Sequence, residues 1–240
     1  MSSLEQLDKN VSLIEQKVRY TFNDKTLLQL AFVHRSFANE NKAIIQEHNE
    51  RLEFLGDAIL GMIVSDFLYE ELPTYPEGEL SYLRSRLVEA SSCARYVQKI
   101  EISSFLLLGR GEAMNKGKGR NSILADLFEA VIGALHLDGG IKVAQAFFFD
   151  HFQSDVLEII KQPHRNWKAE LQDFCQKTYH QPPTYRVLKE EGPDHLKMFY
   201  ILVMVKGQEL GKGDGSSKKE AEQMAAEDAI KKLGLKARSI

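Results

Sequence analysis

The 240-residue chain has only two cysteines, Cys93 and Cys175, which lie far apart in the sequence. Neither belongs to a Cys-x-x-Cys pair or to a Cys/His cluster. A disulfide framework is therefore excluded, and a structural zinc site has no matching ligand spacing. We interpret both cysteines as ordinary buried or half-buried thiols.

Long hydrophobic runs are also missing. The first residues, MSSLEQLDKN, lack the basic and apolar regions of a signal peptide, and no apolar run reaches the roughly 18 residues that suggest a membrane span. No glycine-rich stretch fits the Walker pattern of a nucleotide-binding loop. We therefore expect a cytoplasmic protein with no membrane partner and no nucleotide cofactor.

The chain has no large excess of positive or negative charge, since its net charge is −3. The charges are nevertheless unevenly distributed along it. Residues 1–163 hold 17 Lys/Arg against 23 Asp/Glu, a net of −6, whereas residues 164–240 hold 14 against 11, a net of +3. An acidic front and a basic back suggest two tasks. Such asymmetry is common, so by itself it is only a weak sign of a polyanionic partner.

Hydrophobic spacing divides the chain at nearly the same place. Residues 1–160 are rich in helix-period patterns, with breaks at Pro73–Gly78 and Gly109–Gly119, and predict an all-α domain. The polar, proline-bearing segment 161–166 is the predicted linker. Residues 167–235 predict a small α+β domain, and residues 236–240 a tail.

The small domain has the order α-β-β-β-α. The expected elements are a helix at Trp167–Thr178, strands at Thr184–Glu191, Lys197–Lys206 and Gln208–Gly213, and a helix at Ser217–Leu233. We expect a three-stranded antiparallel sheet with two helices on one face. The second strand turns Phe199, Ile201, Val203 and Val205 toward these helices. Its other face carries Tyr200, Leu202 and Met204, which we expect to be exposed and take as a candidate docking patch.

Two predicted helices carry carboxylates in unusual places. In HNERLEFLGDAIL (48–60), Glu50, Glu53 and Asp57 share one stripe. In SILADLFEAVIGALHL (122–137), Asp126 and Glu129 are the only acids of an apolar helix. Burying such acids is costly without a cation, and an all-oxygen set suits Mg²⁺ or Mn²⁺ better than zinc. Spacing alone favours a simpler interpretation for the first stripe, a solvated helix face with ion pairs.

The first of these segments resembles the signature of the ribonuclease III family, an Asn-Glu-x-Leu-Glu-Phe-Leu-Gly-Asp run, and ILADLFEA resembles its Asp-x-x-Glu motif. His34-Arg35-Ser36 and Glu77-Gly78 match family positions in the right order, so the resemblance covers nearly the whole chain. It implies an endoribonuclease that cuts double-stranded RNA with Mg²⁺, or Mn²⁺ as a substitute. The products would carry 5′-phosphates, 3′-hydroxyls and short 3′ overhangs, and the substrates would be ribosomal RNA precursors and structured transcripts.

The resemblance also assigns roles to individual residues. The metal-binding carboxylates it implies are Glu53, Asp57, Asp126 and Glu129, with Asp57 and Glu129 as catalytic residues. Glu50 and Glu77 match secondary acidic positions around the cutting centre. Phe54 matches an aromatic ring that plugs the partner subunit, which implies a homodimer. For this residue the alternative is a plain core phenylalanine.

The predicted last helix begins with a Ser-x-x-Glu capping box, Ser217 and Glu220, and carries Lys218 and Lys219 in its first turn. These lysines oppose the helix macrodipole, which makes sense at an end that meets phosphates. The element order and the Lys-Lys-x-Ala-Glu start resemble the double-stranded-RNA-binding domain. This resemblance implies phosphate contacts from the two lysines and minor-groove contacts from Gln172, Asp173 and His195.

Two other functions remain open at this point. One is a catalytically silent RNA-binding scaffold with the same fold, against which the four intact carboxylates argue. The other is an all-α metal-binding or nucleotide hydrolase fused to an RNA-binding module. The Asn49–Asp57 run argues against that second alternative.

Overall fold

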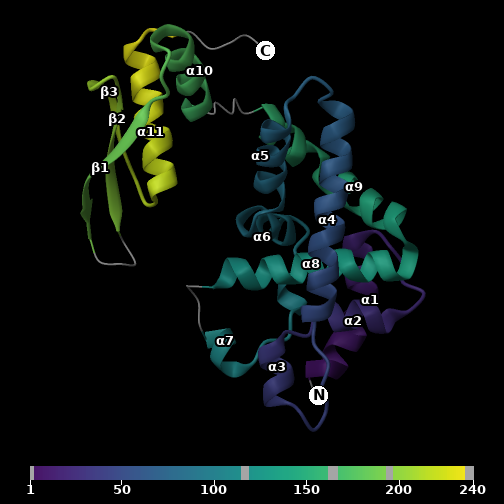
Figure 1. Ribbon diagram of the computed structural model, residues 1–240. Helices are drawn as coiled ribbons and strands as arrows, with labels where there is room; N and C mark the ends of the chain where they lie inside the picture. The colour runs from purple at the N-terminus through teal and green to yellow at the C-terminus, as the bar shows by residue number, and fades with distance from the viewer. Residues whose placement is uncertain (1–2, 115–118, 162–166, 193–196, 236–240) are drawn as a thin grey trace. The chain divides into compact units, whose positions relative to one another are not determined.

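The computed structural model describes residues 3–114, 119–161, 167–192 and 197–235. The chain divides into two compact units, Met1–Gln162 and Pro163–Ile240 (Figure 1). The first is helical and the second combines a sheet with helices, so the predicted fold class is confirmed. None of the helices in the described ranges is long and apolar enough to cross a membrane.

The helices of the first unit agree with the predicted all-α class. They are α1 (Ser3–Val18), α2 (Lys25–Ala31), α3 (Arg35–Glu40), α4 (Glu50–Glu71), α5 (Glu77–Val88), α6 (Ala90–Lys99), α7 (Arg110–Met114), α8 (Arg120–Gly139) and α9 (Ile141–Lys161), with a 3-10 turn η1 at Ser103–Phe105. Two expectations change. The break predicted at Gly109–Gly119 contains α7, and the Glu77-Gly78 pair begins α5 instead of ending a loop.

Helix α8 lies at the centre of the first unit. Ten of its residues are buried, and they face several directions. A helix that is apolar all round is buried by partners on every side. On one side Phe128 packs in an aromatic cluster with Tyr96, Phe148 and Phe152, whose ring centroids lie 4.5–6.4 Å apart. Asp126 and Glu129, in the middle of α8, therefore lie close to a dry core.

Helices α4 and α8 cross at two glycines (Figure 1). A Cβ atom added to Gly56 would lie 1.7 Å from the main-chain oxygen of Glu129, and one added to Gly133 would lie 2.3 Å from that of Leu52. The two main chains therefore touch directly, which only glycine allows at these positions. The stripe of Leu52, Leu55 and Ile59 faces the core as predicted.

The second unit has the predicted order. Helix α10 (Trp167–Tyr179) precedes strands β1 (Thr184–Glu191), β2 (Met198–Val205) and β3 (Gln208–Gly215), which form an antiparallel sheet in the order β1-β2-β3, and α11 (Lys218–Lys232) follows. Both helices share one core with the expected face of β2, and Ala221, Ala225 and Ala229 are fully buried in it. Glycines of β3 allow this close approach, since a Cβ on Gly213 would lie 2.1 Å from the nitrogen of Ala225.

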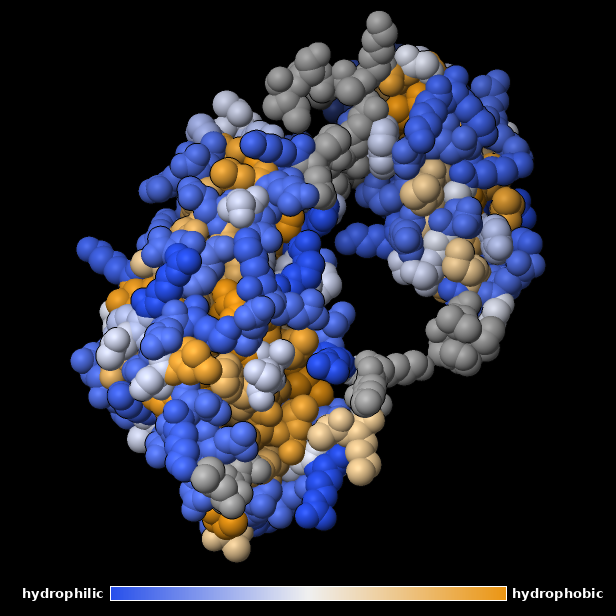
Figure 2. Space-filling model, turned by 180° about the vertical axis from the view of Figure 1, so that it is seen from behind, coloured by the Kyte–Doolittle hydropathy of each residue, from blue (hydrophilic) through white to orange (hydrophobic). Residues whose placement is uncertain are grey.

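The outer face of β2 differs from the expectation. Leu202 is only 4% exposed, and Tyr200 and Met204 are half-buried. Leu202 stands in register between Arg186 and Lys212, whose long side chains flank it from the neighbouring strands. The predicted exposure is therefore wrong for Leu202, while the docking role of this face stays a prediction. In the view of Figure 2 most of the visible surface of this unit is hydrophilic.

Candidate active site

Three of the four expected carboxylates converge where α4 and α8 cross. Ligand oxygens of Glu53, Asp126 and Glu129 all lie within 4.8 Å of one another. Glu53 comes from the first turns of α4, whereas Asp126 and Glu129 stand one turn apart on α8. The glycine crossing brings the two helices close enough for this grouping.

The same three carboxyl groups have raised pKa values. Burial is the main cause in each case, and the neighbouring negative charges add to it. The effect is largest for Glu129, where burial together with Asp57, Asp126 and Glu53 raises the pKa to about 8. The surroundings of these three carboxyl groups therefore disfavour their negatively charged forms.

Asp57 completes the acidic centre from a more open position. It lies one turn after Glu53 on α4 and is exposed. Its charge still raises the pKa of both Glu53 and Glu129. Asp57 is thus electrostatically part of the centre, although its carboxylate lies outside the tight group of three.

The chemistry of this donor set fits a hard divalent cation. All the ligand atoms are carboxylate oxygens, which Mg²⁺ and Mn²⁺ prefer, and zinc would favour nitrogen or sulfur. In the part of the chain that the structure describes, none of the ion pairs involves Glu53, Asp126 or Glu129. Burial and like charge therefore outweigh the positive charge near these three acids, which for Asp126 comes from His34.

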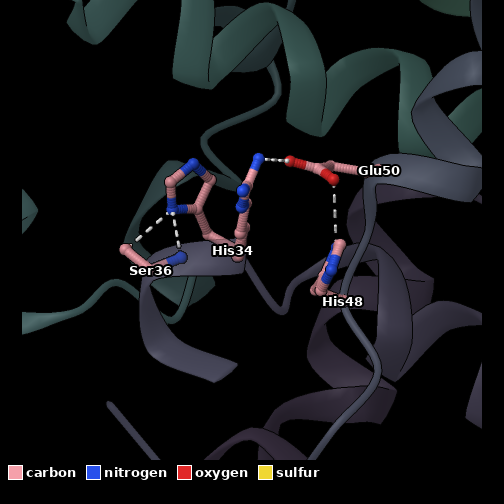
Figure 3. Close-up of polar contacts among 5 residues, drawn as sticks. His34, Ser36, His48 and Glu50 are labelled. Atoms are coloured by element: carbon pink, nitrogen blue, oxygen red, sulfur yellow. Dashed lines mark hydrogen bonds and ion pairs between the residues drawn. The ribbon is translucent and has the colours of Figure 1, made fainter. Parts of the chain in front are cut away.

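Glu50 lies at the edge of the centre and is neutralised differently. Its carboxylate accepts a hydrogen bond from Arg35 Nη1 at 3.1 Å and faces His48 Nδ1 at 3.8 Å (Figure 3). Its charge also raises the pKa of Glu53 and Asp126. Glu50 therefore links the acidic group to the basic residues before α4.

His34 acts electrostatically on Asp126. It lowers the pKa of Asp126, against the dominant effect of burial. Its Nδ1 accepts the N–H of Ser36 at 3.2 Å and lies 2.7 Å from the Ser36 hydroxyl (Figure 3). This hydroxyl in turn accepts the N–H of Gly109 at 2.9 Å. This chain of contacts ties α3 to the segment that leads into α7.

The remaining two expected residues of this unit do not join the group. Glu77 begins α5, beyond the far end of α4, and accepts a hydrogen bond from the Ser81 hydroxyl at 2.7 Å. Phe54 is 81% exposed, so it is not a core phenylalanine. Met62 and Tyr69 on the same helix are also exposed.

Sequence reasoning missed Gly56 and Gly133, which set the spacing of the centre. Both glycines are isolated residues inside apolar helices, and such a glycine can indicate that another backbone packs closely against the helix. It also missed that Cys93 is fully buried beside the acids, where burial and the charges of Glu129 and Asp57 raise the pKa of its thiol. Cys93 is thus a structural thiol, as expected.

The expected RNA-contacting residues of the second unit lie on its surface. Gln172 and Asp173 are exposed on α10, and Lys218 and Lys219 are exposed in the first turn of α11. His195 lies outside the described residues. The Ser217 hydroxyl accepts the N–H of Glu220 at 3.2 Å, as the capping box requires. Glu220 accepts in return from the N–H of Ser216 at 2.8 Å, one residue earlier than predicted.

Comparisons with known proteins agree with this arrangement. Residues 24–156 match the family model described as Ribonuclease-III-like, and residues 167–233 match the double-stranded RNA binding motif. Ribonuclease 3 of Protochlamydia amoebophila is 58% identical over 98% of this chain and 97% of its own length. Ribonuclease 3 of Caldanaerobacter subterraneus is 42% identical over 94% and 99%.

Solved structures show the same similarity in three dimensions. One structure of the nuclease domain of ribonuclease III from Campylobacter jejuni matches with a TM-score of 0.53 and 38% identity, covering 58% of this chain and 94% of that one. A second structure of that domain matches with a TM-score of 0.53 and 36% identity over 65% and 99%. With the acidic centre on α4 and α8 and the sheet-containing unit after it, the chain belongs to the ribonuclease III family.

Proposed function

We propose that the chain is a metal-dependent endoribonuclease that hydrolyses phosphodiester bonds in double-stranded RNA. The observation that carries this proposal is the convergence of Glu53, Asp126 and Glu129 within 4.8 Å, in a member of the ribonuclease III family. Three carboxylates in so small a space serve no packing purpose and destabilise the fold unless a cation joins them. The double-stranded RNA binding motif in the second unit supports the substrate.

Each residue of the centre has a distinct task in this proposal. Glu53, Asp126 and Glu129 would hold Mg²⁺, for which Mn²⁺ could substitute, and Asp57 would extend the set on its exposed side. When bound, such a cation would supply a more acidic water and positive charge to offset the leaving oxygen. Glu50, held by Arg35 and facing His48, lines the outer edge where RNA arrives. The raised pKa of Glu129 shows how strongly this position favours a positive partner.

The second unit supplies affinity for the duplex in this proposal. Lys218 and Lys219 contact phosphates across the major groove, while Gln172 and Asp173 reach the minor groove. His195, outside the described residues, would assist them. Such binding follows the shape of an A-form duplex and its backbone charge, with little dependence on base sequence.

We also propose a homodimer, because one centre cuts one strand and a duplex has two. The exposed ring of Phe54 on α4 supports this assembly, and Met62 and Tyr69 extend the apolar surface along the helix. One solved relative, the nuclease domain from Campylobacter jejuni, is described as having structural flexibility in a region involved in dimer formation. Glu77 stays a predicted secondary acidic residue of the centre.

The domain boundaries and the cellular location of the protein are part of the same proposal. We assign residues 1–160 to the catalytic domain, 161–166 to a linker, 167–235 to the RNA-binding domain and 236–240 to a tail. The protein would act on ribosomal RNA precursors and structured transcripts in the cytoplasm. The competing function is a silent RNA-binding scaffold.

One experiment decides between the two. A long RNA duplex is incubated with the full chain, with and without Mg²⁺, and the product ends are mapped. Cleavage that requires Mg²⁺ and leaves 5′-phosphates with short 3′ overhangs supports the endoribonuclease. Duplex binding without cleavage, in either Mg²⁺ or Mn²⁺, would favour the scaffold.

A further inference from the structure

Glu190, near the end of β1, contacts two lysines at once. Its carboxylate lies 2.8 Å from Lys197 Nζ and 3.1 Å from Lys218 Nζ. One oxygen faces each lysine, Oε2 toward Lys197 and Oε1 toward Lys218. A single carboxylate therefore bridges two ammonium groups that come from different elements, the start of β2 and the start of α11.

The ring of Phe199 lies under the same three groups. Phe199 stands directly opposite Glu190 in the β1–β2 register, so both side chains are on one face of the sheet. Lys197 Nζ lies 5.8 Å from the centre of this ring and Lys218 Nζ lies 5.5 Å from it. The two ammonium groups are thus positioned together over one aromatic surface, which attracts both.

Stability does not explain this arrangement well. Lys218 is more than half exposed, and exposed ion pairs stabilise folded proteins little. Lys218 also occupies the first turn of α11, where a positive charge opposes the helix macrodipole. The hydrogen bonds from Lys197 and Lys218 lower the pKa of Glu190, so the bridge is fully charged at neutral pH.

We propose that Lys197 and Lys218 form one binding site for an RNA backbone phosphate, and that Glu190 is its internal counter-ion, displaced when RNA binds. The inference rests on the proposed function, since it concerns the same duplex. It adds Lys197 as a phosphate ligand. It also gives Glu190 a role that opposes binding.

The chemistry of the two anions supports this exchange. A carboxylate and a phosphodiester both present two anionic oxygens, and each can bridge two ammonium groups. The phosphate also fits the N-terminal end of α11, which is the positive end of the helix macrodipole. Before RNA binds, Glu190 keeps the two lysines together. Afterwards the phosphate replaces it, and the freed carboxylate returns to solvent.

The neighbouring residues provide a matched control. Lys189 Nζ lies 2.8 Å from Glu191 and 4.3 Å from the centre of the Tyr200 ring. This trio has the same composition, a lysine, a glutamate and an aromatic ring. Tyr200 is on the face of β2 opposite to Phe199, away from α10 and α11. Substitutions there change the same charges on the same strand without touching the proposed site.

The test measures duplex affinity of the full chain by fluorescence anisotropy, with chelator present so that nothing is cut, at several salt concentrations. Glu190→Gln should tighten binding at least threefold, because the competing charge is gone, and Glu191→Gln should change it less than 1.5-fold. Lys197→Ala should weaken binding at least threefold and reduce the slope of log affinity against log salt by about 0.7–0.9. Lys189→Ala should leave the slope unchanged.

Each outcome is decisive. Weaker binding by Glu190→Gln would mean that the carboxylate only positions the lysines, which overturns the displacement. Equal behaviour of Lys197→Ala and Lys189→Ala would remove Lys197 from the site. If the wild-type chain binds no duplex at all, the proposed function fails. If it binds and the four variants match it, only this inference fails.

Discussion

The two units of the chain hold their charged groups in opposite ways. On α4 and α8, carboxylates of one sign are packed together, half-buried, with raised pKa values. On the sheet and α11, several exposed lysines have an acidic partner, such as Glu190 for Lys218 or Asp228 for Lys232. The first site lacks a counter-charge until a cation arrives, and the second already carries one.

The two sites therefore differ in their effect on the free energy of folding. Repulsion between the carboxylates of the acidic centre destabilises the helical unit, and its packing holds these charges together. The basic surface costs little, because exposed pairs form and break easily in water. Changes in the first unit should therefore alter both stability and cleavage, while changes in the second should mainly alter affinity for RNA.

The largest expected effect is that of Glu129→Gln on cleavage. The substitution keeps the size of the side chain but removes the charge that holds the cation. Cleavage of a duplex should fall about a thousandfold, since metal assistance is worth several kcal/mol. Duplex affinity in a gel-shift titration should stay within about twofold, because the second unit supplies it. Glu158→Gln, an exposed acid on α9, is the control, and wild-type cleavage by Glu129→Gln would remove this carboxylate from the mechanism.

The second effect concerns the glycine crossing. Gly56→Ala places a methyl group 1.7 Å from the main-chain oxygen of Glu129, so α4 and α8 must separate. We expect a loss of about 3 kcal/mol or more in the free energy of unfolding, as for severe overpacking. Gly61→Ala on the same helix meets nothing within 4 Å and should stabilise the protein by about 1 kcal/mol. Denaturant titration of both variants checks this, and equal stability would contradict the main-chain contact.

The third effect concerns assembly. Phe54→Ala removes an 81% exposed ring and should raise the dimer dissociation constant about 30-fold, the effect of a typical interface anchor. Sedimentation velocity over a range of protein concentrations measures it. Ile44→Ala, which removes a 68% exposed side chain outside α4, is the control. A wild-type chain that stays monomeric at micromolar concentration would refute the dimer.

The fourth expected effect is the pH dependence of stability without metal. The pKa of Glu129 is about 8 in the folded protein and near its ordinary value of 4.5 when unfolded. Between these values the folded state binds more protons, so stability should fall as pH rises from about 4.5 to 8. Thermal unfolding in chelator should show this fall, and Glu129→Gln should reduce it. Saturating Mg²⁺ should restore stability most at pH 8, since it binds the charged form.

The sequence predicted most of the fold because its patterns are strong. The apolar residues of α8, the alternation in β2 and the alanine spacing in α11 each have one favourable burial arrangement. The outer face of β2 was the exception. Alternation shows which way Leu202 points, but not that Arg186 and Lys212 flank it in register. Cross-strand neighbours depend on register, which a single strand does not contain.

The site could be predicted only in part. The acids on each helix could be identified from the sequence, and the family resemblance assigned them to one site. The distance between the two helices could not be predicted. That distance depends on Gly56 and Gly133 meeting across the crossing, a long-range contact that no local spacing encodes. The bridge formed by Glu190 was missed for the same reason, since Lys197 and Lys218 are separated by the whole of β2 and β3.

The contact between α4 and α8 has a further consequence for how the centre responds to heat. Two main chains in contact have no side-chain rotamers between them, so the distance between the backbones that carry Glu53 and Glu129 has no adjustable part. Warming should not loosen the cation site gradually. Affinity for the cation should instead stay nearly constant until the helical unit melts, and the two should be lost in one transition.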